Sequence, residues 1–115
     1  MMKITFLGAG STVFAKNVLG DCIINKNLGN FIISLYDIDP VRLEDSYKML
    51  IHINQTMNGK AVVEKHLDRK AALMGASYII NAIQVGGYDP ATILDFEIPK
   101  KYGFRQTIGD TLSIG

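Results

Sequence analysis

The stretch Lys3–Phe14, which reads KITFLGAGSTVF, constrains the fold more than any other part of the chain. Strand-forming residues over 3–7 run into Gly8-Ala9-Gly10, and the apolar residues that follow recur at helical spacing. A strand, a Gly-x-Gly turn and a helix in this order present backbone N–H groups at a helix N-terminus, where they bind phosphate. The stretch therefore predicts a first strand, a helix over about 11–25, and a pyrophosphate site between them.

The rest of the chain repeats this alternation of strands and helices. Short apolar runs predict strands over 31–36, 61–65 and 77–83, and periodic apolar positions predict helices over about 39–57, 68–74 and 89–103. Asp39-Pro40 and Asp89-Pro90 are each typical of a helix N-cap followed by proline at the first helical position. Buried strands joined by helices predict an α/β fold, a Rossmann-like doubly wound parallel sheet with strand order 3-2-1-4, truncated before its last strands.

Length and composition favour one soluble domain over residues 1–115. The chain is 48% hydrophobic and 20% charged, and its formal net charge is +1. Because the net charge is small and no basic run exceeds Lys100-Lys101, we expect no nucleic acid partner. No apolar run approaches the roughly 20 residues that cross a bilayer, so we expect no membrane partner. A single cysteine excludes an intrachain disulfide and fits a cytoplasmic protein. The turn-like residues before Gly115 predict a chain that is part of a longer protein.

Glycine has a specific use at the first turn. Gly8 permits a tight turn, and Gly10 lets the backbone approach a phosphate because it carries no Cβ. The third glycine of the full dinucleotide fingerprint is replaced by Val13. A strand-to-helix turn that binds no ligand would contain the same glycine pair, so both interpretations stay open at this point.

Asp37 follows the second predicted strand, where an acidic side chain can accept hydrogen bonds from the adenosine ribose hydroxyls of a dinucleotide. A carboxylate there favours NAD over NADP, because it would repel a 2′-phosphate. Asp39 lies nearby, but a helix N-cap accounts for it. No such structural role competes for Asp37, so the sequence predicts that Asp37 binds the ribose of NAD.

Two further segments belong, in the predicted topology, to the carboxyl edge of the sheet. The loop after the fourth strand contains Gln84, Gly86 and Gly87, and its glycines permit either close approach to the nicotinamide half of a dinucleotide or simply a turn. The last residues include a group of polar side chains, Arg105, Gln106, Asp110 and Thr111. These polar residues either hold a polar substrate or form a solvated loop.

The remaining chemistry-bearing side chains predict no metal site. Cys22 lies on the apolar face of the first helix and is expected to pack in the core. His52 and His66 are far apart in the predicted topology, and neither has metal-ligand spacing with a cysteine or a carboxylate. We expect both histidines to be solvated or satisfied locally.

Six segments carry a resemblance to a known family: Lys3–Phe14, Asn17–Asp21, Asp37–Glu44, Gln84–Pro90, Asp95–Glu97 and Gln106–Leu112. Together they resemble the NAD-dependent glycoside hydrolases of family four, and within that family the α-galactosidases (melibiases). The resemblance covers essentially the whole chain and is far more specific than a Gly-x-Gly turn.

The resemblance implies a hydrolysis that departs from the usual two-carboxylate scheme. In family members, a tightly held NAD takes a hydride from C3 of the sugar, which makes the C2 proton acidic. A base removes that proton, the glycosidic oxygen leaves by elimination, water adds, and the hydride returns. A divalent metal, commonly Mn²⁺, polarises the C2 and C3 oxygens as a Lewis acid.

The resemblance also implies roles for residues of this chain. The cofactor-binding residues would be Gly8, Gly10, Ser11, Thr12 and Val13 at the pyrophosphate, Asp37 at the ribose, and Gln84, Gly86 and Gly87 at the nicotinamide. Asp110 would contact substrate hydroxyls. Gln84 replaces an arginine typical of the branches that act on 6-phosphorylated sugars, which favours an unphosphorylated α-galactoside ahead of an α-glucoside.

The family's metal-binding Cys and His, and its catalytic acid and base, belong to segments after residue 115. The resemblance therefore implies a chain without catalytic residues or Mn²⁺ ligands, which binds NAD but hydrolyses nothing alone, and a homo-oligomer at full length. Two other functions stay open: an NAD-dependent dehydrogenase of the lactate/malate type, and a non-enzymatic dinucleotide-binding module.

Overall fold

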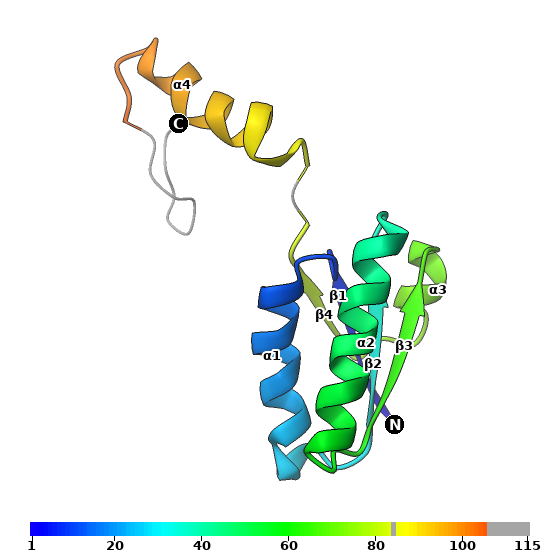
Figure 1. Ribbon diagram of the computed structural model, residues 1–115. Coiled ribbons are helices and arrows are strands. Elements are labelled where there is room, and N and C mark those ends of the chain that lie inside the picture. The colour runs from blue at the N-terminus through cyan, green and yellow to red at the C-terminus, as the bar shows by residue number, and fades with distance from the viewer. Residues whose placement is uncertain (84, 106–115) are drawn as a thin grey trace. The chain divides into compact units, whose positions relative to one another are not determined.

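The computed structural model describes residues 1–83 and 85–105, with Tyr88 described by its backbone alone (Figure 1). The chain divides into two compact units, Met1–Ile83 and Gln84–Gly115. The first unit contains the sheet and is the larger one.

The first unit alternates strands and helices as the sequence predicts. Its elements are β1 (Met2–Leu7), α1 (Thr12–Ile24), a 3₁₀ turn (Lys26–Leu28), β2 (Phe31–Tyr36), α2 (Pro40–Thr56), β3 (Ala61–His66), α3 (Arg69–Leu73) and β4 (Tyr78–Asn81). All neighbouring strands pair in parallel, in the order β3-β2-β1-β4. The predicted α/β fold and strand order are therefore confirmed.

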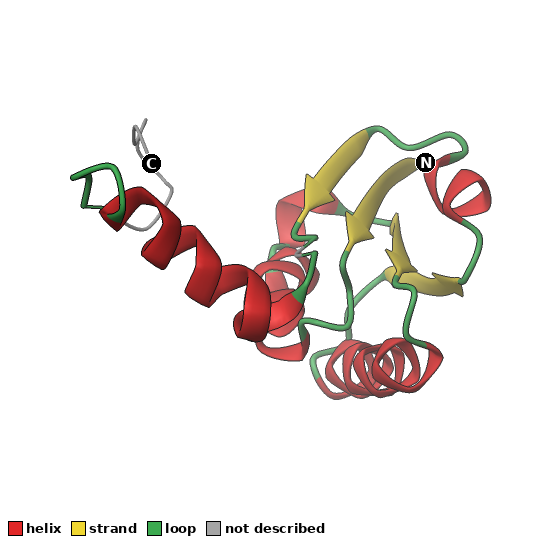
Figure 2. Cartoon of the chain, turned by 90° about the horizontal axis from the view of Figure 1, so that it is seen from above, coloured by secondary structure: helices red, strands yellow, loops and turns green. Residues whose placement is uncertain are grey.

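Helices cover both faces of the sheet, because successive strand residues point to opposite sides. Phe6 contacts Phe14 of α1, with ring centroids 5.7 Å apart, so α1 covers the face to which Phe6 points. Thr5 points the other way and donates a hydrogen bond to the carbonyl oxygen of Ala72 in α3 at 2.8 Å. Figure 1 shows α1 and α2 side by side, and Figure 2 shows helices on both sides of the strands.

The core forms mainly where α1 and α2 pack against the central strands. Its fully buried large side chains include Phe6, Leu19, Phe31, Ile33, Leu35 and Leu50. The central strands β1 and β2 are mostly apolar because both of their faces are covered, and their polar residues Lys3, Thr5 and Ser34 are buried as well.

β4 differs from the strand predicted over 77–83. It is shorter, and Tyr78 and Ile79 remain 63% and 55% exposed. The reason is its position at the edge of the sheet, where it pairs only with β1 among the described strands.

No helix among the described residues is long and apolar enough to cross a membrane.

The second unit contains a helix close to the one predicted over 89–103, but its beginning is irregular. A π-helical turn over Gly87–Thr92 precedes α4 (Ile93–Lys100), and the Asp89-Pro90 bond is cis. The predicted N-cap at Asp89 is wrong for α4, because the helical backbone of the preceding turn continues through Thr92, which directly precedes the regular α-helix at Ile93. A turn over 101–103 ends the helix, with Gly103 at φ +79°.

Candidate functional site

The Gly8–Thr12 loop and Asp37 lie next to each other, because they follow the paired strands β1 and β2. The backbone N–H groups of Gly8 and Ala9 both donate to the carbonyl oxygen of Tyr36, at 3.0 and 2.9 Å. The turn after β1 is thus tied to the end of β2. This juxtaposition is the one that the parallel-sheet prediction requires.

Gly8 must be glycine for two reasons. Its φ is +89°, a backbone conformation that side chains disfavour. A Cβ there would also lie 2.5 Å from the carbonyl oxygen of Ala82, which directly follows β4. The beginning of the loop after β4 therefore packs against the first glycine.

Gly10 is constrained by Asp37. Its N–H donates to Asp37 Oδ2 at 2.7 Å, and a Cβ at this position would lie 2.7 Å from the same oxygen and 3.0 Å from Cβ of Arg42. Close packing against Asp37 and α2 therefore requires glycine here even before any ligand is considered. The sequence suggested only the approach of a phosphate.

Asp37 has a structural role that the sequence analysis denied it. While Oδ2 accepts from Gly10, Oδ1 accepts from the backbone N–H of Asp39 at 2.9 Å. The statement that no structural role competes for Asp37 is therefore wrong, because this carboxylate braces the glycine loop against the start of α2. An ionised carboxylate offers about four acceptor positions, so these bonds leave capacity for further donors.

The N-terminus of α1 is uncapped. Its N-cap residue Ser11 makes no side-chain capping bond, and no acidic residue occupies the first turn. Among the described residues, the backbone N–H groups of Thr12, Val13 and Phe14 have no acceptor. Val13, which replaces the third glycine of the fingerprint, is 73% exposed beside them. These N–H groups and the positive end of the helix dipole fit an anion.

The other helices of the first unit satisfy their N-termini internally. Asp39 accepts from the backbone N–H groups of Val41 and Arg42 at 3.0 and 3.2 Å, and Asp68 accepts from Ala71 at 3.3 Å. The N-cap predicted at Asp39, with Pro40 first in α2, is confirmed.

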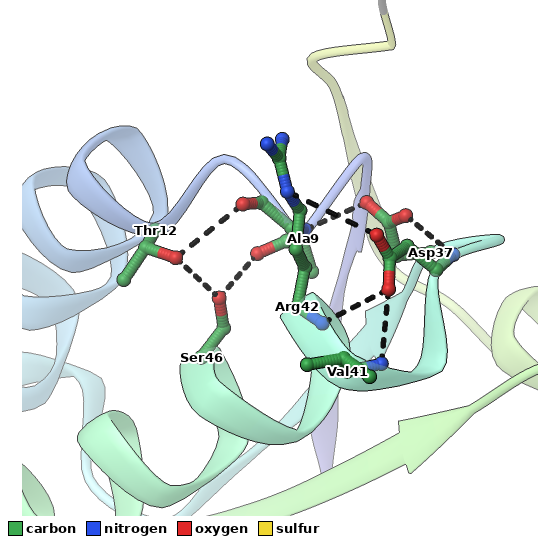
Figure 3. A network of polar contacts seen from close by, with 8 residues as sticks. Ala9, Thr12, Asp37, Val41, Arg42 and Ser46 are labelled. Carbon is green, nitrogen blue, oxygen red and sulfur yellow. Dashed lines mark hydrogen bonds and ion pairs between the residues drawn. The ribbon is translucent and has the colours of Figure 1, made fainter.

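Ser46 of α2 is part of the site, although the sequence analysis did not single it out. Its side chain is fully buried, and Oγ donates to the carbonyl oxygen of Ala9 at 2.6 Å. Ser46 Oγ also lies 3.3 Å from Thr12 Oγ1, as Figure 3 shows. The available signal was a hydroxyl between Leu43 and Leu50 on the buried stripe of α2.

The other predicted site residues belong to the second unit, Gln84–Gly115. Gln84 and Asp110 lie outside the described residues, as do Gln106 and Thr111. Gly86 and Gly87 belong to the second unit and have positive φ values of 87° and 68°. A Cβ on Gly86 would lie 2.7 Å from Cβ of Ala91, so this glycine serves the turn that precedes α4. Their assignment to the nicotinamide side stays a prediction.

Among the described residues, Cys22, His52 and His66 make no hydrogen bond to the Gly8–Thr12 loop. Cys22 is half-buried, and burial, reinforced by the charge of Asp21, raises the pKa of its thiol. His66 Nε2 lies 3.1 Å from Oε2 of Glu64, and His52 is exposed. The described residues contain no group of three or more side chains able to hold a metal ion.

Residues 3–115 match the model of a family described as family 4 glycosyl hydrolase. The chain is 58% identical over 115 residues to an α-galactosidase of Bacillus subtilis strain 168, covering 100% of this chain and 27% of that protein. It is 35% identical over 108 residues to an α-glucosidase of Erwinia rhapontici, covering 94% of this chain and 24% of that protein.

The fold is similar to that of a 6-phospho-β-glucosidase from Thermotoga maritima, solved with manganese, NAD⁺ and glucose-6-phosphate. The TM-score is 0.66 and the identity 26%, over 90% of this chain and 25% of that one. The chain thus spans about a quarter of the length of each of these proteins.

Proposed function

The chain belongs to the family 4 glycosyl hydrolases, and on that premise we propose that it forms the NAD-binding part of an α-galactosidase. The structural observation that carries the proposal is the uncapped N-terminus of α1 beside Asp37, at the carboxyl ends of β1 and β2. The 58% identity with an α-galactosidase supports the galactoside over the glucoside, whose relative is 35% identical.

The described residues fit the pyrophosphate of NAD. The backbone N–H groups of Thr12 and Val13 supply donors, and the exposed hydroxyl of Ser11 adds another. Gly8 and Gly10 contribute shape rather than donors, since their own N–H groups are bonded to Tyr36 and Asp37. The loop would therefore hold the phosphates on the first turn of α1.

Asp37 fits the adenosine ribose. Its bonds to Gly10 and Asp39 orient the carboxylate before any ligand arrives, and its remaining acceptor capacity suits the 2′- and 3′-hydroxyls. A 2′-phosphate would face a negative charge, so the site favours NAD over NADP.

NAD, when bound, would supply the reversible oxidation of the substrate sugar at C3. Gln84, Gly86 and Gly87 would line its nicotinamide side, and Asp110 would hold substrate hydroxyls. We further propose that the ligands of Mn²⁺ and the catalytic acid and base belong to segments other than 1–115, so that this part alone is inactive. The working protein would be a cytoplasmic homo-oligomer with no nucleic acid or membrane partner.

A lactate/malate-type dehydrogenase and a non-enzymatic dinucleotide-binding module are not favoured, because the family match extends over residues 3–115. The decisive test measures release of p-nitrophenol from p-nitrophenyl α-galactoside by the complete gene product, with and without NAD, and the α-glucoside serves as the control substrate. Hydrolysis should require NAD and should favour the galactoside. Unchanged hydrolysis after removal of NAD would contradict the proposal.

A further inference from the structure

We propose that Ser46 is a positioning residue for the phosphate site, which fixes the orientation of the glycine loop through Ala9 and Thr12. The inference rests on the proposed NAD binding. Ser46 lies on α2, is fully buried and cannot reach a ligand itself. It therefore acts only through the backbone and side chains that it contacts.

The Ala9–Gly10 peptide group is held at both ends. Its carbonyl oxygen accepts from Ser46 Oγ at 2.6 Å, and its N–H donates to Asp37 Oδ2 at 2.7 Å. This peptide is trans, so the carbonyl and the N–H point in opposite directions, and the two bonds hold the peptide plane from opposite sides. Figure 3 shows Ser46 and Asp37 on either side of the loop.

Ser46 also connects to the first residue of α1. Thr12 Oγ1 lies 3.3 Å from Ser46 Oγ and 3.3 Å from the carbonyl oxygen of Gly10. A hydroxyl has one proton: that of Ser46 goes to Ala9 at the shorter distance, and that of Thr12 is divided between the carbonyl oxygen of Gly10 and Ser46 Oγ, which are equally far from it. The hydroxyl of Thr12 is thereby held against Ser46 and Gly10, which ties the first residue of α1 to the same buried hydroxyl.

The position of this hydroxyl argues that it has a specific purpose. Ser46 lies between Leu43 and Leu50 on the buried stripe of α2, where an apolar side chain would normally pack. A buried hydroxyl is costly unless it is hydrogen-bonded. Of the two partners of Ser46, Ala9 belongs to the turn between β1 and α1, and Thr12 is the first residue of α1.

Loss of the Ser46 hydroxyl would release one end of the clamped peptide. Gly10 has no Cβ to restrict rotation, so the Ala9 carbonyl could turn toward the phosphates and repel them. The N–H groups of the first turn would then be held less firmly in the geometry that a pyrophosphate needs.

The test compares Ser46→Ala with Ser34→Ala in the complete gene product freed of NAD. Ser34 is also fully buried and also donates to a backbone carbonyl, that of Ala72 at 3.0 Å, but it packs against α3. Calorimetric titration gives the Kd for NAD, and thermal unfolding gives Tm. Ser46→Ala should raise Kd on the order of tenfold. Ser34→Ala should lower Tm to a similar extent and leave Kd within about twofold of the unmodified protein.

A rescue variant separates the hydroxyl from the shape of the side chain. Ser46→Thr keeps the donor and should recover most of the affinity for NAD, whereas Ser46→Cys, a weak donor of similar size, should not. Ser46→Cys also replaces Ser46→Ala if that variant fails to fold. Equal Kd values for the unmodified protein and Ser46→Ala, or equal losses in Ser46→Ala and Ser34→Ala, would overturn the inference. If the unmodified protein does not bind NAD, the proposed function fails and the inference fails with it.

Discussion

Helices α1 and α2 follow neighbouring strands, but their N-termini differ in hydrogen bonding: that of α2 has a side-chain cap and that of α1 has none. The N-cap residue of α2 is Asp39, whose side chain accepts from the first turn of that helix. The N-cap residue of α1 is Ser11, whose side chain makes no such bond, and the hydroxyl of Thr12 is turned inward toward Ser46. Within the part of the chain that the structure describes, the first turn of α2 has a side-chain cap, whereas the first turn of α1 presents N–H groups without an acceptor.

The position of the nearest carboxylates explains how this difference is maintained. Asp37 could have capped α1 but bonds to Gly10, two residues before the helix begins. Its charge is thereby held at the edge of the phosphate site, where a ribose would lie. The N–H groups of the first turn of α1 are therefore available to a ligand, because Ser11 does not cap them and the nearest carboxylate, Asp37, bonds to Gly10 instead.

The largest effect is expected from giving α1 the cap that α2 has. Ser11→Asp would accept from the first turn as Asp39 does, which should stabilise the fold by about 1 kcal/mol. The same carboxylate would oppose the pyrophosphate and weaken NAD binding by about 3 kcal/mol, roughly a hundredfold. Two measurements test these opposite effects: Tm should rise because the fold is more stable, and the calorimetric Kd for NAD should increase because binding is weaker. Ser11→Asn, a neutral cap, is the control and should bind NAD better than Ser11→Asp.

A smaller effect is expected where the loop packs against Asp37. Gly10→Ala puts a Cβ 2.7 Å from Asp37 Oδ2, so either the carboxylate or the loop must move. We expect NAD binding to weaken by about 2 kcal/mol. Gly20→Ala is the matched control, because a Cβ there meets nothing within 4 Å. Equal NAD affinities for the two variants would contradict the packing argument.

The fold was predictable from local pattern, because apolar runs and Asp39-Pro40 mark elements without reference to distant residues. The strand order followed from the rule that helices connect parallel strands. Among the strands, β4, which is poorly covered, was predicted to be longer than it is. The irregular start of α4 was missed because Asp89-Pro90 resembles the cap at Asp39 in sequence alone.

The site was predictable only in part. The glycines and Asp37 stand at positions that the topology brings together, and residue type identified them. The contacts of Ser46 with Ala9 and of Asp37 with Gly10 span 37 and 27 residues, so no local pattern shows them. The roles of Gln84 and Asp110 stay predictions.

A moderate effect is expected from neutralising Asp37, whose carboxylate bonds to Gly10 before α1 and to Asp39 before α2. Asp37→Asn keeps one acceptor oxygen but loses a bond to either Gly10 or Asp39, and it removes the charge that opposes a 2′-phosphate. NAD binding should weaken by about 1.5 kcal/mol, while the preference for NAD over NADP narrows. Titration with both dinucleotides measures this. An unchanged NAD affinity would remove Asp37 from the site.

The smallest effect is expected at the capped helix itself. Asp39→Ala removes the acceptor for Val41 and Arg42 but leaves the backbone N–H that donates to Asp37. Stability should fall by about 1 kcal/mol, seen as a lower Tm, with Kd for NAD within about twofold of the unmodified protein. The reason is that this cap satisfies α2 alone and provides nothing to the loop. A large loss of NAD affinity would mean that the two helix starts are one unit, and that the contrast between them is not the origin of the phosphate site.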